Sequence, residues 1–406
     1  MLAILSTHPI QYQVPLWQAL ARDGKVPFEV WYLSNHAATQ SFDSEFKRAF
    51  AWDLNMLEGY PFQFLETNTN PDVARFTKLR LLAPLSEQLR KKRVKALWIQ
   101  GWQVAAYWQA AWQAYAARIP VWLRGESNDL AQVALWKRPI KRLAMRELFT
   151  RITHFLYIGQ ANRRFYKKFG VRDEQLRPAY YCVDNHRFMN VAEELRPERF
   201  KIRREWGIPE DKFCVLFAGK FIAKKRPLDL VRAATNLGKS GHEPHLLFVG
   251  SGELGGQIRG ACNIVFDAES GCAPKPVAAA VNGGRPTASF TGFLNQTEIS
   301  KAYVAADCLV LPSDHRETWG LVVNEAMASG LPCLVSNSCG CAEDLVAPIN
   351  SDYCFPSGDI GAMSDVLEKI LHDNVEPSRF KSHIDKFCFD VSIDTVKNLY
   401  YSLEEA

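Results

Sequence analysis

Short apolar runs alternate with longer helical patterns along the whole of this 406-residue chain. Gly, Pro and polar residues bound the runs, and runs of this kind with helices between them are typical of parallel sheets. The runs are Leu2–Leu5, Phe28–Leu33, Ala96–Ile99, Val121–Leu123, Phe155–Ile158, Cys214–Ala218, His245–Val249, Ile264–Phe266, Ser289–Thr291, Cys308–Leu311 and Cys333–Val335. The sequence therefore predicts an α/β protein with doubly wound parallel sheets.

A polar stretch rich in Arg and Glu, residues 183–209, interrupts this pattern near the middle of the chain. Chains of this length usually form two or three domains, and we place the boundary in this stretch. We expect two Rossmann-like domains facing each other across a cleft, formed by residues 1–190 and 200–388. The last helix, about residues 390–406, is expected to return to the first domain. Residues 268–286, rich in Ala, Gly and Pro, are predicted to form a long loop.

The net charge of +5 is distributed unevenly along the chain. Residues 1–200 carry 29 basic and 18 acidic side chains, whereas residues 201–406 carry 20 and 26. Clusters of Lys and Arg in the first half suit an anionic membrane surface, although solvated helix faces are the more ordinary explanation. Nucleic acid is not an expected partner, because no recognised binding motif accompanies the charge. The clusters lie at residues 90–93, 137–142 and 163–168.

No stretch of the sequence is predicted to cross a membrane. The nearest candidate, Trp102 to Leu123, contains Gln103, Gln109 and Gln113, so a buried or amphipathic soluble helix is expected there. The N-terminus lacks the basic and long apolar regions of a signal peptide. We therefore expect a cytoplasmic protein, with peripheral attachment to the inner face of the plasma membrane as an option.

The ten cysteines contain no Cys-x-x-Cys pair and no zinc-like spacing. Reduced thiols that serve as small core residues are expected instead. The histidines form neither a His-x-His nor a His-Glu-x-x-His pattern, so the sequence predicts no metal site.

Two glutamates fall on one predicted strand–loop–helix unit. The run Cys308–Leu311 ends at Pro312, a polar loop carries Glu317, and a helical pattern beginning near Trp319 carries Glu325. In an open parallel sheet, such loops lie where ligands bind. Carboxylates accept hydrogen bonds from hydroxyls, and a helix N-terminus donates to phosphates. A ligand with both hydroxyls and phosphates is therefore indicated.

A basic loop follows the first strand of the second half. Lys220 and Lys225 lie five residues apart after Ala218, close enough for both to reach one diphosphate. Basic side chains at this end of a strand are placed to neutralise phosphates. A solvated basic turn is the alternative explanation.

A Gly-x-Gly-x-x-Gly pattern, residues 250–255, follows the next strand, and Asp267 follows the strand after that. This spacing also fits a nicotinamide or flavin site. However, that fingerprint belongs after the first strand of its domain, and here it follows the second. A tight turn that lines a nucleotide cleft is the favoured interpretation.

Together these motifs resemble the GT-B-fold glycosyltransferases of family 4, the retaining group. The order of elements is similar along essentially the whole chain, and Thr7 to Leu16 is similar to the opening of some bacterial members. The Glu-x7-Glu run is the most specific of the motifs, while the single lysines and glycines are not specific alone. The motifs are Glu317-x7-Glu325, Lys220 with Lys225, Gly250-Ser251-Gly252 and Gly292-Phe293.

The resemblance implies roles on the donor side. Glu317 would hold hydroxyls of the donor sugar and Glu325 the ribose, while Lys220 and Lys225 would bind the diphosphate; Glu317 and both lysines are thus the catalytic candidates. The backbone along Thr318, Trp319, Gly320 and Leu321 would lie beside the sugar and phosphates, and Gly250, Gly252 and Glu253 would approach the base or ribose. The family requires no metal or other cofactor, because cationic side chains and a helix end stabilise the leaving diphosphate.

The first half departs from the family pattern. His8-Pro9-Ile10-Gln11 replaces the usual Gly-Gly loop, and Gln100 stands in the segment where many relatives carry a His. The best acceptor-side candidates are His8, Gln11, Arg124 and Glu126. Arg124 and Glu126 could equally form a buried structural pair.

The resemblance implies a hexosyltransferase type of enzyme. It would move a sugar, with retention, from a UDP- or GDP-sugar to a hydroxyl of a saccharide or lipid-linked saccharide in cell-surface polysaccharide or glycolipid synthesis. The alternatives are a GT-B epimerase or phosphorylase, or a catalytically silent glycan-binding member. The Glu-x7-Glu run disfavours the first two, and the intact basic loop disfavours the third.

Overall fold

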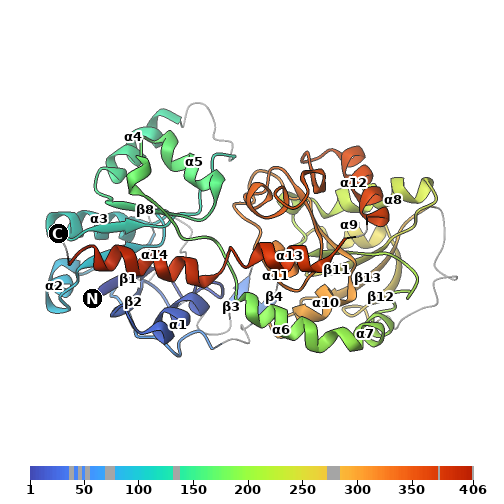
Figure 1. The fold of residues 1–406 in the computed structure, drawn as a ribbon, viewed down its shortest axis with the longest axis horizontal. Coiled ribbons are helices and arrows are strands. Elements are labelled where there is room, and N and C mark those ends of the chain that lie inside the picture. Colours follow the sequence, from blue (N-terminus) through green and yellow to red (C-terminus); the bar gives the residue numbers. More distant parts are fainter. Residues whose placement is uncertain are drawn as a thin grey trace. The chain divides into compact units, whose positions relative to one another are not determined.

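The computed structural model describes residues 1–35, 41–43, 48–50, 55–68, 78–130, 138–271, 284–373 and 375–404. The chain divides into two compact units (Figure 1). The first unit comprises Met1–Ser41, Leu54–Cys182 and Phe387–Ala406, and the second comprises Phe42–Asp53 and Val183–Lys386. Each unit contains one seven-stranded sheet, which confirms the predicted α/β class with two Rossmann-like domains.

The sheet of the first unit is parallel throughout, in the order β5-β2-β1-β6-β7-β8-β9. Its strands are β1 Leu2–Ser6, β2 Phe28–Tyr32, β5 Phe62–Phe64, β6 Ala96–Ile99, β7 Val121–Leu123, β8 His154–Tyr157 and β9 Leu176–Pro178. Its helices are α1 Val14–Asp23, α2 Leu85–Lys91, α3 Ala105–Ala116, α4 Arg138–Phe149, α5 Gln160–Lys168 and α14 Phe389–Tyr401, with a 3-10 turn at Asp173–Gln175.

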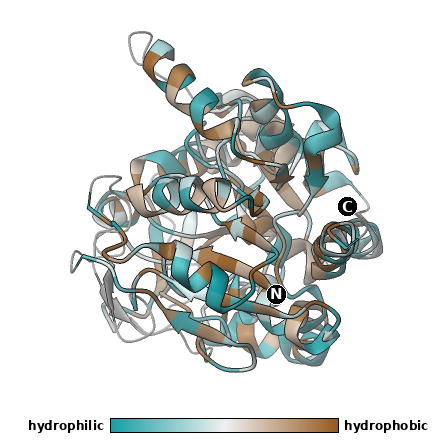
Figure 2. Cartoon of the chain, turned by 90° about the vertical axis from the view of Figure 1, so that its left-hand side faces the viewer, coloured by the Kyte–Doolittle hydropathy of each residue, from teal (hydrophilic) through white to brown (hydrophobic). Residues whose placement is uncertain are grey.

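Alternation along the strands explains why this sheet is covered on both faces. Leu97 and Ile99 of β6 belong to a core cluster that includes residues of α2 and α3. Trp98, between them, points to the other face and meets Trp17 of α1 edge-on, with ring centroids 5.4 Å apart. Both faces are apolar because successive strand residues point to opposite sides. Figure 2 shows predominantly hydrophobic strands inside and helices of mixed hydropathy around them.

The sheet of the second unit is also parallel, in the order β12-β13-β11-β10-β14-β15-β16. Its strands are β10 Cys214–Ala218, β11 His245–Val249, β12 Asn263–Asp267, β13 Thr287–Gly292, β14 Cys308–Leu311, β15 Cys333–Ser336 and β16 Cys354–Phe355. Its α-helices are α6 Asn185–Leu195, α7 Arg199–Glu205, α8 Pro227–Lys239, α9 Gly255–Gly260, α10 Ile299–Ala305, α11 Leu321–Ala328, α12 Ile360–His372 and α13 Pro377–Ile384. Short turns of other helix types cover Arg196–Glu198, Ala223–Lys225, Ala342–Val346 and Ser351–Tyr353, and a separate two-stranded pair joins β3 Ser41–Asp43 to β4 Arg48–Phe50.

The polar stretch at residues 183–209 consists largely of α6 and α7, and the division between the units falls at its start, after Cys182. The helix expected from Trp102 is shorter than its apolar pattern, because α3 ends at Ala116 and β7 follows. The predicted loop at residues 268–286 runs from the end of β12 to the start of β13, but residues 272–283 lie outside the described part of the chain.

The C-terminal helix α14 belongs to the first unit, and both chain ends lie there (Figure 1). Its Thr395 hydroxyl donates to the carbonyl of Pro178 at 2.7 Å, and the Tyr401 hydroxyl donates to the carbonyl of Lys25 at 2.9 Å. These bonds fix the helix against β9 and the loop that follows α1.

Among the described residues, no helix is long and apolar enough to span a bilayer. The nine described cysteines are free thiols, and seven of them are buried. Burial raises the pKa of Cys214 and of Cys262 to about 12, so these thiols are core residues rather than nucleophiles.

Candidate functional site

The basic loop and the Glu317 loop meet because their strands are neighbours. β10 and β14 pair in parallel, so the segments that follow them leave the sheet at the same edge. The backbone N–H of Asp314 donates to the carbonyl of Lys224 at 2.9 Å, which joins the two loops directly. β11 flanks β10 on its other side, so the loops that follow three neighbouring strands, β11, β10 and β14, lie at the same edge of the sheet.

Glu317 and Lys225 form an ion pair across these loops, between the carboxylate and the ammonium group. Their side chains are only 12% and 15% exposed, respectively, so water screens the pair weakly. Lys220, two residues beyond the end of β10, is partly buried in the same loop. The structure therefore brings together one predicted carboxylate and one predicted cation, with the second cation nearby in sequence.

The loop after β15 supports the backbone around Glu317. The N–H of Gly340 donates to the Glu317 carbonyl at 3.3 Å, and the N–H of Cys341 donates to the Trp319 carbonyl at 3.2 Å. Gly320 has φ +109°, and a Cβ there would lie 2.6 Å from Cδ2 of Leu311. Only glycine fits this position without displacing the core, so the entry to α11 is tightly defined.

The residues from Thr318 to Leu321 differ in how far their side chains are exposed to a ligand. Thr318 is exposed, and Leu321 is partly buried. Trp319 is 3% exposed, and its indole N–H donates to Oδ1 of Asn324 at 2.8 Å. Trp319 therefore anchors α11 to the core, and its side chain is buried away from a donor.

Gly250 and Gly252 allow the loop after β11 to lie against the basic loop. The Phe221 N–H donates to the Ser251 carbonyl at 2.8 Å, and the Gly219 N–H donates to the Val249 carbonyl at 2.9 Å. A Cβ on Gly250 would lie 2.1 Å from the Gly219 carbonyl oxygen. The glycines thus permit close backbone packing, while Glu253 is exposed.

In the competing dinucleotide interpretation of this glycine pattern, Asp267 would bind a ribose, but in the structure its carboxylate is already paired. Arg259 binds Asp267 through both carboxylate oxygens, at 2.7 and 3.1 Å. Asp267 is 2% exposed, so the ion pair holds it inside the fold. A ribose would have to displace this bidentate contact.

Glu325 lies in a different environment from Glu317. Its Oε2 accepts a hydrogen bond of 2.5 Å from the hydroxyl of Tyr303 on α10. Burial raises the pKa of Glu325, and the Tyr303 hydroxyl and the nearby Arg187 charge act in the opposite direction. Arg187 is in turn held by the side chain of Gln296 at 2.6 Å. A ribose hydroxyl would therefore share this carboxylate with Tyr303.

In the first unit, His8 and Gln11 lie in the segment between β1 and α1. Thr7 Oγ1 is 3.0 Å from Nδ1 of His8, and the Ser6 hydroxyl donates to the His8 carbonyl at 3.2 Å. The side-chain oxygen of Gln11 is buried and accepts no hydrogen bond from the described residues. β1 lies between β2 and β6, where the strand order of this sheet reverses, so both residues occupy its switch point.

Arg124 and Glu126 meet at Tyr181 rather than in an ion pair with each other. The Tyr181 hydroxyl donates to Oε1 of Glu126 at 2.6 Å, and the Arg124 guanidinium lies over the Tyr181 ring at 4.8 Å. Arg124 is 5% exposed and also donates to the Ala179 carbonyl at 3.4 Å. Both side chains are thus tied to the segment after β9.

Gln100 is a residue that the motif comparison did not select. It directly follows β6, is 7% exposed, and neither polar atom of its side chain has a hydrogen-bond partner among the described residues. Unpaired buried amides are costly, so such a group needs an explanation. The signal in the sequence was a polar residue directly after an apolar strand, in the segment where many relatives carry a histidine.

Comparison with solved structures defines the class of fold. The structure of HepE from Anabaena, in complex with UDP and glucose, superposes with a TM-score of 0.64 at 15% identity, over 98% of this chain and 99% of that one. At that identity the match shows the fold alone. The chain therefore has the GT-B fold, with two parallel-sheet α/β domains.

Sequence comparison identifies the second unit more closely. Residues 198–387 match the family model described as "Glycosyl transferases group 1". This segment, slightly less than half of the chain, is a group 1 glycosyltransferase domain. It includes Lys220, Lys225, Glu317 and Glu325.

Two curated relatives extend this finding. An uncharacterized glycosyltransferase of Methanocaldococcus jannaschii, MJ1607, is 27% identical over 206 residues, which are 50% of this chain and 47% of the relative. A GDP-mannose-dependent alpha-mannosyltransferase of Mycobacterium tuberculosis is 29% identical over 173 residues, which are 42% of this chain and 38% of the relative. The matches thus span less than half the length of each relative.

Proposed function

We propose that this chain is a hexosyltransferase that moves a sugar from a UDP- or GDP-sugar to a hydroxyl of a saccharide or lipid-linked saccharide, with retention of anomeric configuration. The observation that carries the proposal is the shielded Glu317–Lys225 pair at the carboxyl edge of the second sheet. A group 1 glycosyltransferase domain and nucleotide-sugar relatives support the reaction class.

The pair suits a ligand that carries both hydroxyls and phosphates. A carboxylate accepts hydrogen bonds from sugar hydroxyls, and an ammonium has three N–H groups, so Lys225 can bind a diphosphate oxygen while it still contacts Glu317. Lys220 would add a second positive charge for the leaving diphosphate. Glu325, through its oxygen not bonded to Tyr303, would receive the ribose.

In the proposed reaction, the acceptor oxygen attacks the anomeric carbon on the face that the diphosphate leaves. The bond from that carbon to the phosphate oxygen breaks, and the departing phosphate takes the proton of the acceptor hydroxyl. Glu317 orients the sugar and forms no covalent bond to it. Positioning and charge stabilisation supply the rate enhancement, and we propose that the donor chemistry requires no metal.

The acceptor contacts belong to the first unit in this proposal. Gln100, Gln11 and His8 follow two neighbouring strands, β6 and β1. The Gln100 amide and the side-chain oxygen of Gln11 have no hydrogen-bond partner among the described residues, and they suit the hydroxyls of a saccharide, which both donate and accept hydrogen bonds. This acceptor assignment adds Gln100 to the residues selected from the sequence.

The most direct test is incubation of the purified chain with a panel of UDP- and GDP-sugars, with release of nucleoside diphosphate as the readout. We expect release from one donor, accelerated by a saccharide or lipid-linked acceptor. Interconversion of the donor sugar without release would indicate an epimerase, and phosphate-dependent cleavage of an oligosaccharide would indicate a phosphorylase. Absence of turnover with every donor, together with glycan binding, would leave the silent glycan-binding alternative.

The stereochemical part of the proposal has its own measurement. NMR of the first product formed gives the configuration at the anomeric carbon. A product with the anomeric configuration of the donor supports front-face attack, and an inverted product contradicts it.

We also propose that the first unit contacts an anionic membrane surface from the cytoplasmic side. Helix α4 carries Ile140 and Leu143, which are 68% and 74% exposed, beside the exposed Arg142 and Arg146. Figure 2 shows hydrophobic bands on this projecting helix. Exposed apolar side chains flanked by Arg suit the boundary between lipid headgroups and acyl chains. In contrast, the basic cluster at residues 163–168 is partly neutralised, because Asp173 pairs with both Arg163 and Lys167.

Flotation with phosphatidylserine-containing vesicles tests this attachment. The wild-type chain should float at low salt and less at high salt, and Leu143→Glu should reduce flotation. Leu82→Glu is the matched control, because Leu82 is 66% exposed and lies outside α4. Failure of the wild-type chain to float at low salt rules out the membrane proposal.

A further inference from the structure

A cluster of potential metal ligands lies at one end of the α8–α12 helix pair in the second unit. His242 follows the C-terminal end of α8, and Glu368 and His372 lie four residues apart in the last turns of α12. One ligand atom from each residue lies within 4.8 Å of the other two. None of the three was selected from the sequence, because His242 is distant in the chain and Glu-x-x-x-His alone is not a metal motif.

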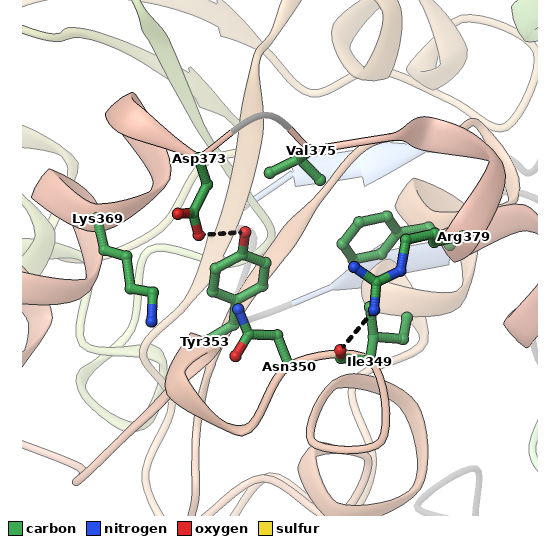
Figure 3. A pocket seen from close by; sticks show the side chains of 8 residues that line it. Ile349, Asn350, Tyr353, Lys369, Asp373, Val375 and Arg379 are labelled. Atoms are coloured by element: carbon green, nitrogen blue, oxygen red, sulfur yellow. Dashed lines mark hydrogen bonds between the residues drawn. The ribbon is translucent and has the colours of Figure 1, made fainter.

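The three side chains lie close to one another at one end of the two helices. His242 Nε2 is 3.8 Å from Glu368 Oε1, and the two imidazole rings are nearly perpendicular, with centroids 5.2 Å apart. The neighbouring α12 residues, Lys369 and Asp373, contact other groups instead. Lys369 pairs with Asp352, and Asp373 accepts a 2.8 Å hydrogen bond from Tyr353. Lys369 and Asp373 instead line a separate pocket of about 330 Å³. Figure 3 shows both side chains at that pocket.

The backbone around the cluster also favours a cation. α8 has 13 residues and ends at Lys239, and α12 has 13 residues and ends at His372. The C-terminal end of each helix carries a partial negative charge, and the cluster lies at these ends, because His372 is the last residue of α12 and His242 follows the end of α8. The two helices pack against each other (Figure 1). The backbone N–H of His242 donates to the Leu237 carbonyl at 3.2 Å, which fixes the base of that side chain against α8.

We infer that His242, Glu368 and His372 bind a divalent transition-metal ion of the zinc type, which joins the C-terminal ends of α8 and α12. Two imidazoles and one carboxylate form a recognised zinc ligand set, with water or another group completing the coordination. Ligand atoms around zinc lie about 2.0–2.2 Å from the ion, so the three side chains must approach one another by small rotations. His242 and Glu368 are partly buried and His372 is exposed, so such rotations require no change in the core.

The role inferred for this ion is structural and separate from the proposed donor chemistry. α8 begins directly after the basic loop that carries Lys225, and the metal cluster lies at its opposite end. An ion that binds the folded chain and not the unfolded chain stabilises the fold. Removal of the ion should therefore lower the melting temperature and leave nucleoside-diphosphate affinity unchanged.

The test uses the full chain, stripped of metal with a chelator and then titrated with Zn²⁺ by calorimetry and by thermal unfolding. We expect Zn²⁺ binding and a rise in melting temperature for the wild-type chain. His372→Ala and Glu368→Gln should each weaken the binding at least about tenfold, consistent with the loss of one ligand, and reduce the thermal shift. His186→Ala is the matched control, because His186 is exposed on α6 and lies outside the cluster.

Two further results separate this site from binding elsewhere. Without metal, His372→Ala should melt at the wild-type temperature, so a lost Zn²⁺ effect cannot come from misfolding. Co²⁺ bound at the cluster should lack the intense near-ultraviolet absorption of thiolate ligation. Equal Zn²⁺ affinity in wild type and His372→Ala, or a thiolate spectrum for the tightest site, overturns the inference.

Discussion

Glu317 and Lys225 are 12% and 15% exposed where their side chains pair at the edge of the second sheet. At such low exposure each charge depends on the other, because an isolated charge in a shielded position is costly. A diphosphate that enters next to Lys225 would meet an ammonium group already held in position. In the proposed function, the ion pair thus holds Lys225 in position before the donor binds.

Lys225→Ala should weaken nucleoside-diphosphate binding by about 10- to 100-fold, the effect of losing one charge-assisted hydrogen bond of about 1.5–3 kcal/mol. Calorimetric titration with UDP and GDP measures the change. Lys224→Ala is the control, since it keeps the carbonyl that accepts from the Asp314 N–H. Unchanged affinity in Lys225→Ala would remove the phosphate role from this residue.

Gln100→Leu should separate function from stability in the first unit. Leucine is similar in size and removes two buried polar atoms that have no partner among the described residues, so the melting temperature should stay the same or rise. Sugar transfer should fall by about tenfold or more through a higher acceptor KM, with nucleotide affinity unchanged. A variant that melts at the wild-type temperature and transfers sugar at the wild-type rate would show that Gln100 does not contact the acceptor.

We expect His245 to make the stability of the second unit depend on pH. It lies in β11, with Nε2 2.9 Å from the Ser289 hydroxyl and Nδ1 3.1 Å from the Thr287 hydroxyl. The Ser289 hydroxyl donates to the Trp206 carbonyl at 2.6 Å, so it accepts from His245 Nε2–H, and Nδ1 accepts from Thr287. Burial lowers the pKa of His245 to about 3, which keeps the ring neutral in the folded chain.

The unfolded chain has the ordinary histidine pKa of about 6.5 and therefore binds more protons than the folded chain between that pH and about pH 3. Stability should fall as the pH drops through this window, by at most about 1.4 kcal/mol per pH unit from this group. Unfolding by urea at pH 7 and pH 5 measures the slope. His245→Gln should show a shallower slope, and an identical slope in both proteins would contradict the assignment.

The Gly250 loop shows how an element of the candidate site depends on backbone geometry. At φ +126°, with a hypothetical Cβ 2.1 Å from the Gly219 carbonyl oxygen, any side chain must push the β10 and β11 loops apart. Gly250→Ala should therefore lower the unfolding free energy by at least about 1–3 kcal/mol and weaken nucleotide binding. Gly256→Ala, where nothing lies within 4 Å of the added Cβ, should be neutral or stabilising by up to about 1 kcal/mol. Equal behaviour of the two variants would contradict this account of the loop.

At the scale of elements, the predictable strands are the ones that are buried on both faces. The bounds predicted for β6, β7, β10, β11 and β14 are those of the structure, because continuous apolar runs between Gly, Pro and polar residues mark them. The short strands β5, β9 and β16 were not predicted. Each of them has only two or three residues and lies at a sheet edge, so its sequence carries no long apolar run. β9 also includes Pro178, a residue that sheets accept mainly at their edges.

The candidate site was predictable where its residues lie in loops directly after strands, and less so where it depends on side-chain packing. Glu317 and Lys225 were expected from their position after strands, and the structure pairs them. The contact between Tyr303 and Glu325 could not be predicted, since it joins α10 to α11 through side chains whose directions only the fold fixes. The same holds for Tyr181, which connects Arg124 and Glu126.

At the scale of the whole molecule, the chain forms two α/β units, each with a parallel sheet, and its last helix belongs to the first unit. The lysines and glutamates proposed to bind the donor all lie in the second unit, and the residues proposed to bind the acceptor lie in the first. The donor half of the proposal rests on a recognised domain and an observed ion pair. The acceptor half rests on the buried Gln100 amide after β6 and the buried side-chain oxygen of Gln11 after β1.

The most direct test of the central claim, that Glu317 orients the donor sugar, is the rate of sugar transfer by Glu317→Gln. Glutamine keeps the shape of the side chain and removes the charge. The proposed function predicts a rate at least about 100-fold below wild type in a variant that still unfolds cooperatively, with a melting temperature lowered by the loss of the ion pair and nucleoside-diphosphate affinity equal to or higher than wild type. A purified variant that transfers sugar at the wild-type rate would contradict the claim.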